Sequence, residues 1–143
     1  MALQAEVSEE TADKVVFENI TMAGNNYGII AKKNRLTKLP IIKNCIIAGN
    51  KKGFDFNDEI DTSSIIYSCI YNDSWNGNTY GYGGGCIFTD PLFADSENGD
   101  FHLMSKAGRW YNSQWVVDDV SSPCIDAGDE NSDYSNEPAP NGG

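Results

Sequence analysis

Short runs of β-branched and aromatic residues alternate with glycine- and asparagine-rich turns along the first half of the chain. Residues 17–25 (FENITMAGN) align with residues 42–50 (IKNCIIAGN) at an offset of 25 positions. Each of these runs is followed by a second apolar run, at residues 28–30 and 53–56. Short strands joined by turns, with no helical pattern between them, do not form βαβ units.

The repeat continues once more with a slightly shorter period. A step of 24 places residues 41–47 over residues 65–71, so that Cys45 falls on Cys69. An antiparallel sandwich does not require equal periods, whereas a solenoid does, because each residue lies about 4.8 Å above its counterpart. The sequence therefore predicts an all-β fold, a right-handed parallel β-helix (solenoid) of about three coils with an irregular C-terminal capping segment.

Recurring polar residues support this stacking. Asn19 falls on Asn44, which the step of 24 places on Ser68, and Asn25 falls on Asn50. Side chains at equivalent turn positions can form a ladder along the coils. We expect such a ladder at Asn19, Asn44 and Ser68.

The pattern divides the chain into four parts. Residues 1–14 are a polar N-terminal segment, and residues 15–93 hold the coils, interrupted by a Gly/Asn/Tyr loop at 76–85. Residues 94–129 are expected to form a closing coil and cap. Residues 130–143 are a polar tail.

Three motifs follow one another in the second half of the chain. They are DPLF (90–93), GDFHL (99–103) and SPCIDAGD (122–129). In this order they resemble the C-terminal coils of secreted bacterial right-handed β-helix proteins of the pectate-lyase-like group. The resemblance implies a carbohydrate-associated protein at an extracellular or cell-surface location, although residues 1–13 do not form a signal peptide. Members of that group have more coils, so we expect either a fragment or a small derived open reading frame.

Charge is unevenly distributed along the chain, whose formal net charge is −11. Residues 19–54 contain seven basic residues and no acidic one, and residues 55–143 contain sixteen acidic residues and two basic ones. An acidic chain of this kind argues against a nucleic-acid partner. A run of apolar residues long enough to span a membrane is also missing from the sequence.

The basic block is one place where an anion could bind. Lys32, Lys33 and Arg35 lie in a loop that the 25-residue offset places beside the acidic Asp58 and Glu59. Ion pairs between the two loops are one interpretation. The alternative is a groove for a uronate polysaccharide, in which a basic residue would abstract a proton.

Aromatic side chains are frequent in and near the predicted loops. Exposed rings in a row can cover the apolar face of a sugar, whereas buried rings would cap the open end of a solenoid. The sugar-binding candidates are Trp75, Tyr80, Tyr82, Trp110, Tyr111 and Trp115, and the capping alternative concerns Trp110, Tyr111 and Trp115.

The sequence gives only weak indications of a metal site or of disulfide bonds. Asp129, Asn131 and Asp133 have part of the spacing of a calcium loop, but without its glycine and distal glutamate. No cofactor other than possible calcium is expected. Cys45 and Cys69 are expected to be free thiols stacked in the core, because in-register neighbours on parallel strands are poorly placed for a disulfide.

The sequence gives no catalytic residues, since it holds a single histidine, His102, which is expected on the surface of a strand. It favours a non-enzymatic module associated with a polysaccharide. The alternatives are a polysaccharide lyase or hydrolase of the pectate-lyase-like group and a self-assembly module. An uncovered first coil, beginning near Val15, would expose strand edges and favour a homo-oligomer.

Overall fold

The computed structural model describes residues 15–31, 39–56, 61–74 and 81–133. Regular structure in these residues consists of twelve strands and one turn of 3₁₀ helix, which confirms the all-β class. The strands form five small sheets of two or three strands each. Three sheets are parallel and come from the first half of the chain, and two are antiparallel hairpins from the second half.

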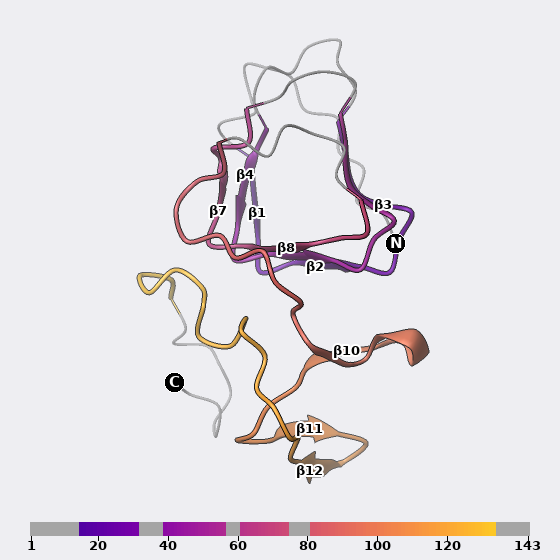
Figure 1. Ribbon diagram of the computed structural model, residues 1–143. Coiled ribbons are helices and arrows are strands. Elements are labelled where there is room, and N and C mark those ends of the chain that lie inside the picture. The colour runs from indigo at the N-terminus through magenta and orange to yellow at the C-terminus, as the bar shows by residue number, and fades with distance from the viewer. Residues whose placement is uncertain (1–14, 32–38, 57–60, 75–80, 134–143) are drawn as a thin grey trace.

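The three parallel sheets are built from successive passes of the chain. The first sheet contains β1 (Val16–Glu18), β4 (Ile41–Lys43) and β7 (Ile65–Ile66); the second contains β2 (Thr21–Ala23), β5 (Ile46–Ala48) and β8 (Cys69–Tyr71); and the third pairs β3 (Tyr27–Ala31) with β6 (Lys52–Phe56). Figure 1 shows the three sheets as three sides of one outline, with the strands of successive passes lying over one another.

The predicted offset of 25 is confirmed between the first two passes, where Val16 pairs with Ile41 and Tyr27 with Lys52. The predicted step of 24 to the third pass is wrong by one residue. Ile46, and not Cys45, pairs with Cys69, which is a step of 23. A one-residue slip exchanges the two faces of a strand. The observed register is the one that keeps the buried Ile47 and Ile70 together.

The ladder expected at Asn19, Asn44 and Ser68 is therefore only partly correct. Asn19 and Asn44 both adopt left-handed backbone conformations, with φ of 57° and 52°, at the same corner of successive passes. In the third pass this conformation belongs to Tyr67 (φ 47°), and Ser68 is buried beyond it. Ser68 instead accepts the backbone N–H of Cys45 through its hydroxyl oxygen at 3.1 Å.

A hydrogen-bonded asparagine ladder does exist at the next corner, where Asn25, Asn50 and Asn72 follow one another. Asn50 is completely buried; its Nδ2 donates to the carbonyl of Met22 at 2.9 Å and to Oδ1 of Asn72 at 2.8 Å. Its Oδ1 accepts the backbone N–H of Asn25 at 3.0 Å. These bonds satisfy the polar side chain in a place from which water is excluded.

The core lies inside the outline of the three sheets. Its buried side chains come from alternate positions of the short strands and from the adjoining corners, and they are Met22, Leu39, Ile42, Cys45, Ile47, Phe54, Ile65 and Ile70. Gly28 of β3 and Gly53 of β6 lie in paired strands of successive passes, which approach each other closely there. A Cβ on Gly28 would lie 2.6 Å from the carbonyl oxygen of Gly53, so a larger residue there would force the two passes apart.

After the third pass the chain continues the parallel stacking with a single bridge and then runs away from the three sheets. Ile87 forms a parallel bridge with Cys69, and its carbonyl accepts the N–H of Ile70 at 2.9 Å. The following chain forms the antiparallel pair β9 (Phe93–Asp95) and β10 (Asp100–Leu103), joined by a 3₁₀ turn at Ser96–Asn98, and then the pair β11 (Arg109–Tyr111) and β12 (Gln114–Val116).

This C-terminal segment, residues 89–133, lies outside the outline, next to the β2–β5–β8 sheet (Figure 1). Phe101 of β10 approaches Gly24 of the first pass, and the N–H of Asp129 donates to Oδ1 of Asn44 in the second at 2.9 Å. The segment is thus held against more than one pass.

Candidate functional site

The β11–β12 hairpin is tightly built. Its two turn residues, Asn112 and Ser113, have φ of 47° and 63°, which is the conformation of a type I′ turn. This turn matches the natural twist of two antiparallel strands, and asparagine is among the residues that adopt it most readily. The pairing is in register, with Trp110 directly opposite Trp115.

The two tryptophans share one face of the hairpin because residues directly opposite each other in an antiparallel pair point to the same side. Both are exposed, Trp110 by 60% and Trp115 by 46%. Trp115 donates its indole N–H to the carbonyl of Ala107 at 3.1 Å. Its ring lies so close to Gly108 that a Cβ there would overlap Nε1. One indole is therefore fixed in orientation while most of the pair faces solvent.

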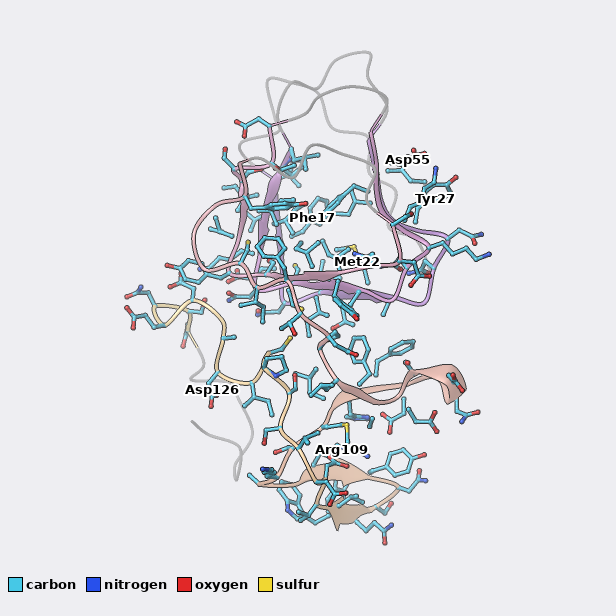
Figure 2. The ribbon with its side chains drawn as sticks, viewed as in Figure 1. Phe17, Met22, Tyr27, Asp55, Arg109 and Asp126 are labelled. Carbon is cyan, nitrogen blue, oxygen red and sulfur yellow. The ribbon has the colours of Figure 1, made fainter. Side chains whose placement is uncertain are left out.

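The opposite face of the hairpin is held to the rest of the segment by Arg109, which is labelled in Figure 2. Its Nε donates to Oδ2 of Asp118 at 2.9 Å and its Nη1 to Oδ2 of Asp100 at 3.2 Å. The guanidinium also lies 5.3 Å from the ring centre of Tyr111, within cation–π range. This cluster connects the hairpin to β10 and to the chain that follows β12.

The pKa values of the cluster follow from these contacts. The hydrogen bond with Asp118 raises the pKa of Arg109. Hydrogen bonds from the Ser105 N–H and then from Arg109 lower the pKa of Asp118. Burial acts to raise the pKa of Asp100, but the hydrogen bonds from His102 and the charge of Arg109 outweigh it and lower the pKa. Both carboxylates therefore stay ionised and keep the hairpin in place at neutral pH.

The other predicted aromatic candidates do not join this face. Tyr82 packs against the ring of Phe88 at 5.2 Å and that of Phe54 at 6.3 Å, and burial raises the pKa of its hydroxyl. Tyr111 is 37% exposed but lies on the Arg109 side. Trp75 and Tyr80 lie outside the described residues. The exposure of Trp110 and Trp115 does not fit the capping role that was considered for them.

The anion-binding candidates Lys32, Lys33 and Arg35, with their expected partners Asp58 and Glu59, also lie outside the described residues. His102 is on β10 with its side chain 60% exposed, as expected.

Of the calcium candidates, Asp129 is engaged in protein contacts. Its Oδ2 lies 2.9 Å from Nζ of Lys43, and its Oδ1 accepts the backbone N–H and the side-chain amide of Asn131, both at 3.0 Å. Within the described part of the chain, no group of three or more His, Cys, Asp and Glu residues is placed to hold a metal ion. The third candidate, Asp133, is exposed at the end of that part.

Two contacts join parts of the chain that are far apart in the sequence, and no sequence pattern predicts them. Asn44 bonds to the Asp129 N–H and donates to Oγ of Ser132 at 2.8 Å, across 85 and 88 residues. Cys69 and Cys124 both line a pocket between β8 and the C-terminal segment. Neither pair has a regular spacing, so no repeat pattern could have revealed it.

Comparison with known proteins places the chain in a family. A family described as "disaggregatase related" matches residues 2–128, which is most of the chain. The chain belongs to the disaggregatase-related family. No curated protein and no solved structure matches it.

This membership corrects the family resemblance drawn from the C-terminal motifs. The assignment to the pectate-lyase-like group is wrong, because the matching family is the disaggregatase-related one. Motifs such as DPLF and SPCIDAGD were therefore not specific to the group they resemble. In the described residues of this disaggregatase-related chain, no helix is long and apolar enough to cross a membrane.

Proposed function

We propose that this domain is a non-enzymatic module that binds a polysaccharide through the paired indoles of Trp110 and Trp115. The observation that carries the proposal is their joint exposure on one face of a rigid hairpin. Neighbouring apolar rings that stay exposed to water are typical of ligand- or partner-binding surfaces. Indole faces can stack on the apolar face of a pyranose, and a fixed orientation reduces the entropy that binding would cost.

The surroundings of the hairpin support this proposal. Val117 and Val120 follow β12 and are 64% and 41% exposed, so apolar exposure is concentrated in this part of the segment. Arg109 anchors the opposite face through two carboxylates. An anchored hairpin with one apolar, solvent-facing side is a suitable surface for an extended ligand.

The family description and the expected cellular location are both compatible with a polysaccharide-binding role. A disaggregatase, by its name, takes an aggregate apart, and a binding module could hold such an activity on its target. A polysaccharide ligand also implies an extracellular or cell-surface location for the domain.

The architecture proposed with this function is a right-handed parallel β-helix of about three coils. Its support is that each pass contributes one strand to each of two parallel sheets, with register steps of 25 and then 23 residues. In such a scaffold the C-terminal segment, and with it the hairpin, would be displayed on one side of a stiff rod.

The test begins with a glycan array to find a ligand, followed by titration calorimetry with the best soluble glycan. We expect Trp110→Ala and Trp115→Ala each to weaken binding by about tenfold, the scale of one lost ring contact. Trp110→Phe should retain part of the affinity. Ile125→Ala is the matched control, because it removes an exposed apolar side chain of the C-terminal segment that is not part of the hairpin surface. Binding that survives loss of both indoles would contradict the proposal.

A self-assembly module is the second candidate. Among the described strands, β1, β2 and β3 each lie at one edge of their parallel sheet, and Val16 of β1 is 50% exposed. Strand edges of this kind can pair with a second copy. Light scattering after gel filtration of the same preparation distinguishes the two roles: a stable oligomer unaffected by loss of the indoles would favour self-assembly.

A further inference from the structure

Two of the four cysteines come together from distant positions in the chain. Cys69 lies on β8, where its neighbour Ile70 points into the core, so the Cys69 side chain faces outward beneath the C-terminal segment. Cys124 lies on that segment, and the two side chains line the same pocket and shift each other's pKa. The Cys69 thiol itself donates to the carbonyl of Thr89 at 3.3 Å. The pocket has a volume of about 100 Å³ and is also lined by Ile46, Ile87 and Ala127.

The two thiols have different environments. The interaction with the neighbouring Cys69 thiol is the main cause that lowers the pKa of Cys124, with a smaller contribution from the Ser122 hydroxyl, while burial acts to raise it. The same contact and burial raise the pKa of Cys69. Cys124 is also the more accessible of the two, since it is partly exposed whereas Cys69 is 3% exposed. A thiolate, and not a thiol, attacks a disulfide, so Cys124 is the better nucleophile.

The other two cysteines are placed differently. Cys45 is buried, and its thiol donates to the carbonyl of Lys43 at 3.1 Å. The thiol of Cys86 donates to the carbonyl of Ile65 at 3.3 Å, and burial raises its pKa. These two residues therefore provide internal controls within the same molecule.

We propose that Cys69 and Cys124 are a redox modification site, at which a disulfide fastens the C-terminal segment to β8. The two cysteines are not register partners on adjacent parallel strands, so the geometric objection to a disulfide between such partners does not apply. The oxidant is a small disulfide such as oxidised glutathione.

The reaction proceeds in two exchanges. The Cys124 thiolate attacks one sulfur of oxidised glutathione, forming a mixed disulfide and releasing one glutathione thiolate. Cys69 then loses its proton to solvent and attacks the Cys124 sulfur, which forms the protein disulfide and releases the second glutathione. The protein loses two electrons and two protons, and one oxidised glutathione becomes two reduced glutathiones.

The bond would join residues 55 positions apart and link the hairpin-bearing segment to the coils. Cross-linking a long loop restricts the unfolded chain and so stabilises the folded state. Such a bond persists in an oxidising compartment and opens in a reducing one. The site would thus make the attachment of the segment depend on the redox conditions around the protein.

The test incubates the full chain with oxidised glutathione and measures intact mass, free thiols and the peptides joined by a disulfide. We expect one linked pair of peptides containing Cys69 and Cys124, two remaining free thiols, and a melting temperature higher by roughly 5–10 °C. Dithiothreitol should reverse all three changes. Four free thiols after incubation, or a linkage through Cys45 or Cys86, would overturn the proposal.

Variants separate the two chemical roles. Cys69→Ser should stop the reaction at the mixed disulfide and leave one glutathione on Cys124, which intact mass detects. Cys124→Ser should prevent both the adduct and the stabilisation. Cys86→Ser should retain the full thermal shift, and far-UV circular dichroism of each reduced variant shows that it folds. Glutathione carried equally by all cysteines in Cys69→Ser would contradict the selectivity.

Discussion

At the scale of single residues, the corners of the parallel sheets depend on asparagines with distinct tasks. Asn19 and Asn44 adopt left-handed conformations that most residues avoid, and Asn tolerates them because its short polar side chain can bond locally. Asn50 is instead buried and bonds to the passes on both sides of it. The same residue type thus supports a turn in one place and joins successive passes in another.

Replacing Asn50 with Ala should strongly destabilise the domain. The change removes the Nδ2 donor from the Met22 carbonyl and from Oδ1 of Asn72, and it removes the Oδ1 acceptor of the Asn25 N–H, at a position that is completely buried. We expect a loss of about 3–5 kcal/mol in the free energy of unfolding, measured by urea denaturation. Asn72→Ala is the control; because Asn72 is less buried, water can replace part of its bonding and the loss should be smaller. Equal losses for the two variants would contradict the ladder as described.

At the scale of elements, the β11–β12 hairpin combines a tight turn, an anchored face and an exposed face. The turn is encoded locally by Asn112 and Ser113, whereas the anchoring needs Asp100 and Asp118 from outside the hairpin. Gly108 has a further role, because only a residue without a side chain leaves room for the Trp115 indole. Its φ of 100° is also one that other residues rarely adopt.

Gly108→Ala should displace the Trp115 ring without unfolding the parallel sheets. The added Cβ would overlap the indole and break its hydrogen bond to Ala107. We expect a change in tryptophan fluorescence and in near-UV circular dichroism, an unchanged far-UV spectrum, and glycan binding weakened by about as much as in Trp115→Ala. Gly99→Ala, at another left-handed position with open space around its Cα, is the matched control. An unaltered fluorescence spectrum in Gly108→Ala would show that the ring is not held as described.

At the scale of the whole molecule, the C-terminal segment is attached to the passes by contacts at several points. Lys43 connects Glu18 of the first pass to Asp129 of the segment, with Nζ–carboxylate distances of 3.6 and 2.9 Å. Figure 2 shows Asp126, three residues before Asp129, on the chain below the β2–β5–β8 sheet. Asn44 adds two hydrogen bonds to the same region.

This attachment should weaken in acid. The hydrogen bond from Lys43, followed by those from Asn131, lowers the pKa of Asp129 from 3.8 to about 2. A folded-state pKa below the unfolded one stabilises the protein above the unfolded value, and the stabilisation is lost as the pH falls from about 4 towards 2. We expect Asp129→Asn to lose less stability than the natural chain over this interval, as measured by urea midpoints at each pH.

Lys43→Met should also make the free energy of unfolding depend less on pH between about 4 and 2. Asp126→Asn, three residues away, is the control. An unchanged slope in both test variants would show that the ion pair does not couple to folding.

The sequence by itself determined the all-β class and the 25-residue register of the first two passes, because periodic apolar runs and corner asparagines are local signals. It did not determine the third step, since a register of 23 or 24 depends on which isoleucine, Ile46 or Ile47, faces inward opposite Ile70. Only the tertiary structure decided that Trp110 and Trp115 face solvent while Tyr82 is packed against other rings. It also decided that Cys69 meets Cys124 and Lys43 meets Asp129. These pairs form where a non-repeating segment folds back over the sheets, and contacts of that kind leave no period in the chain.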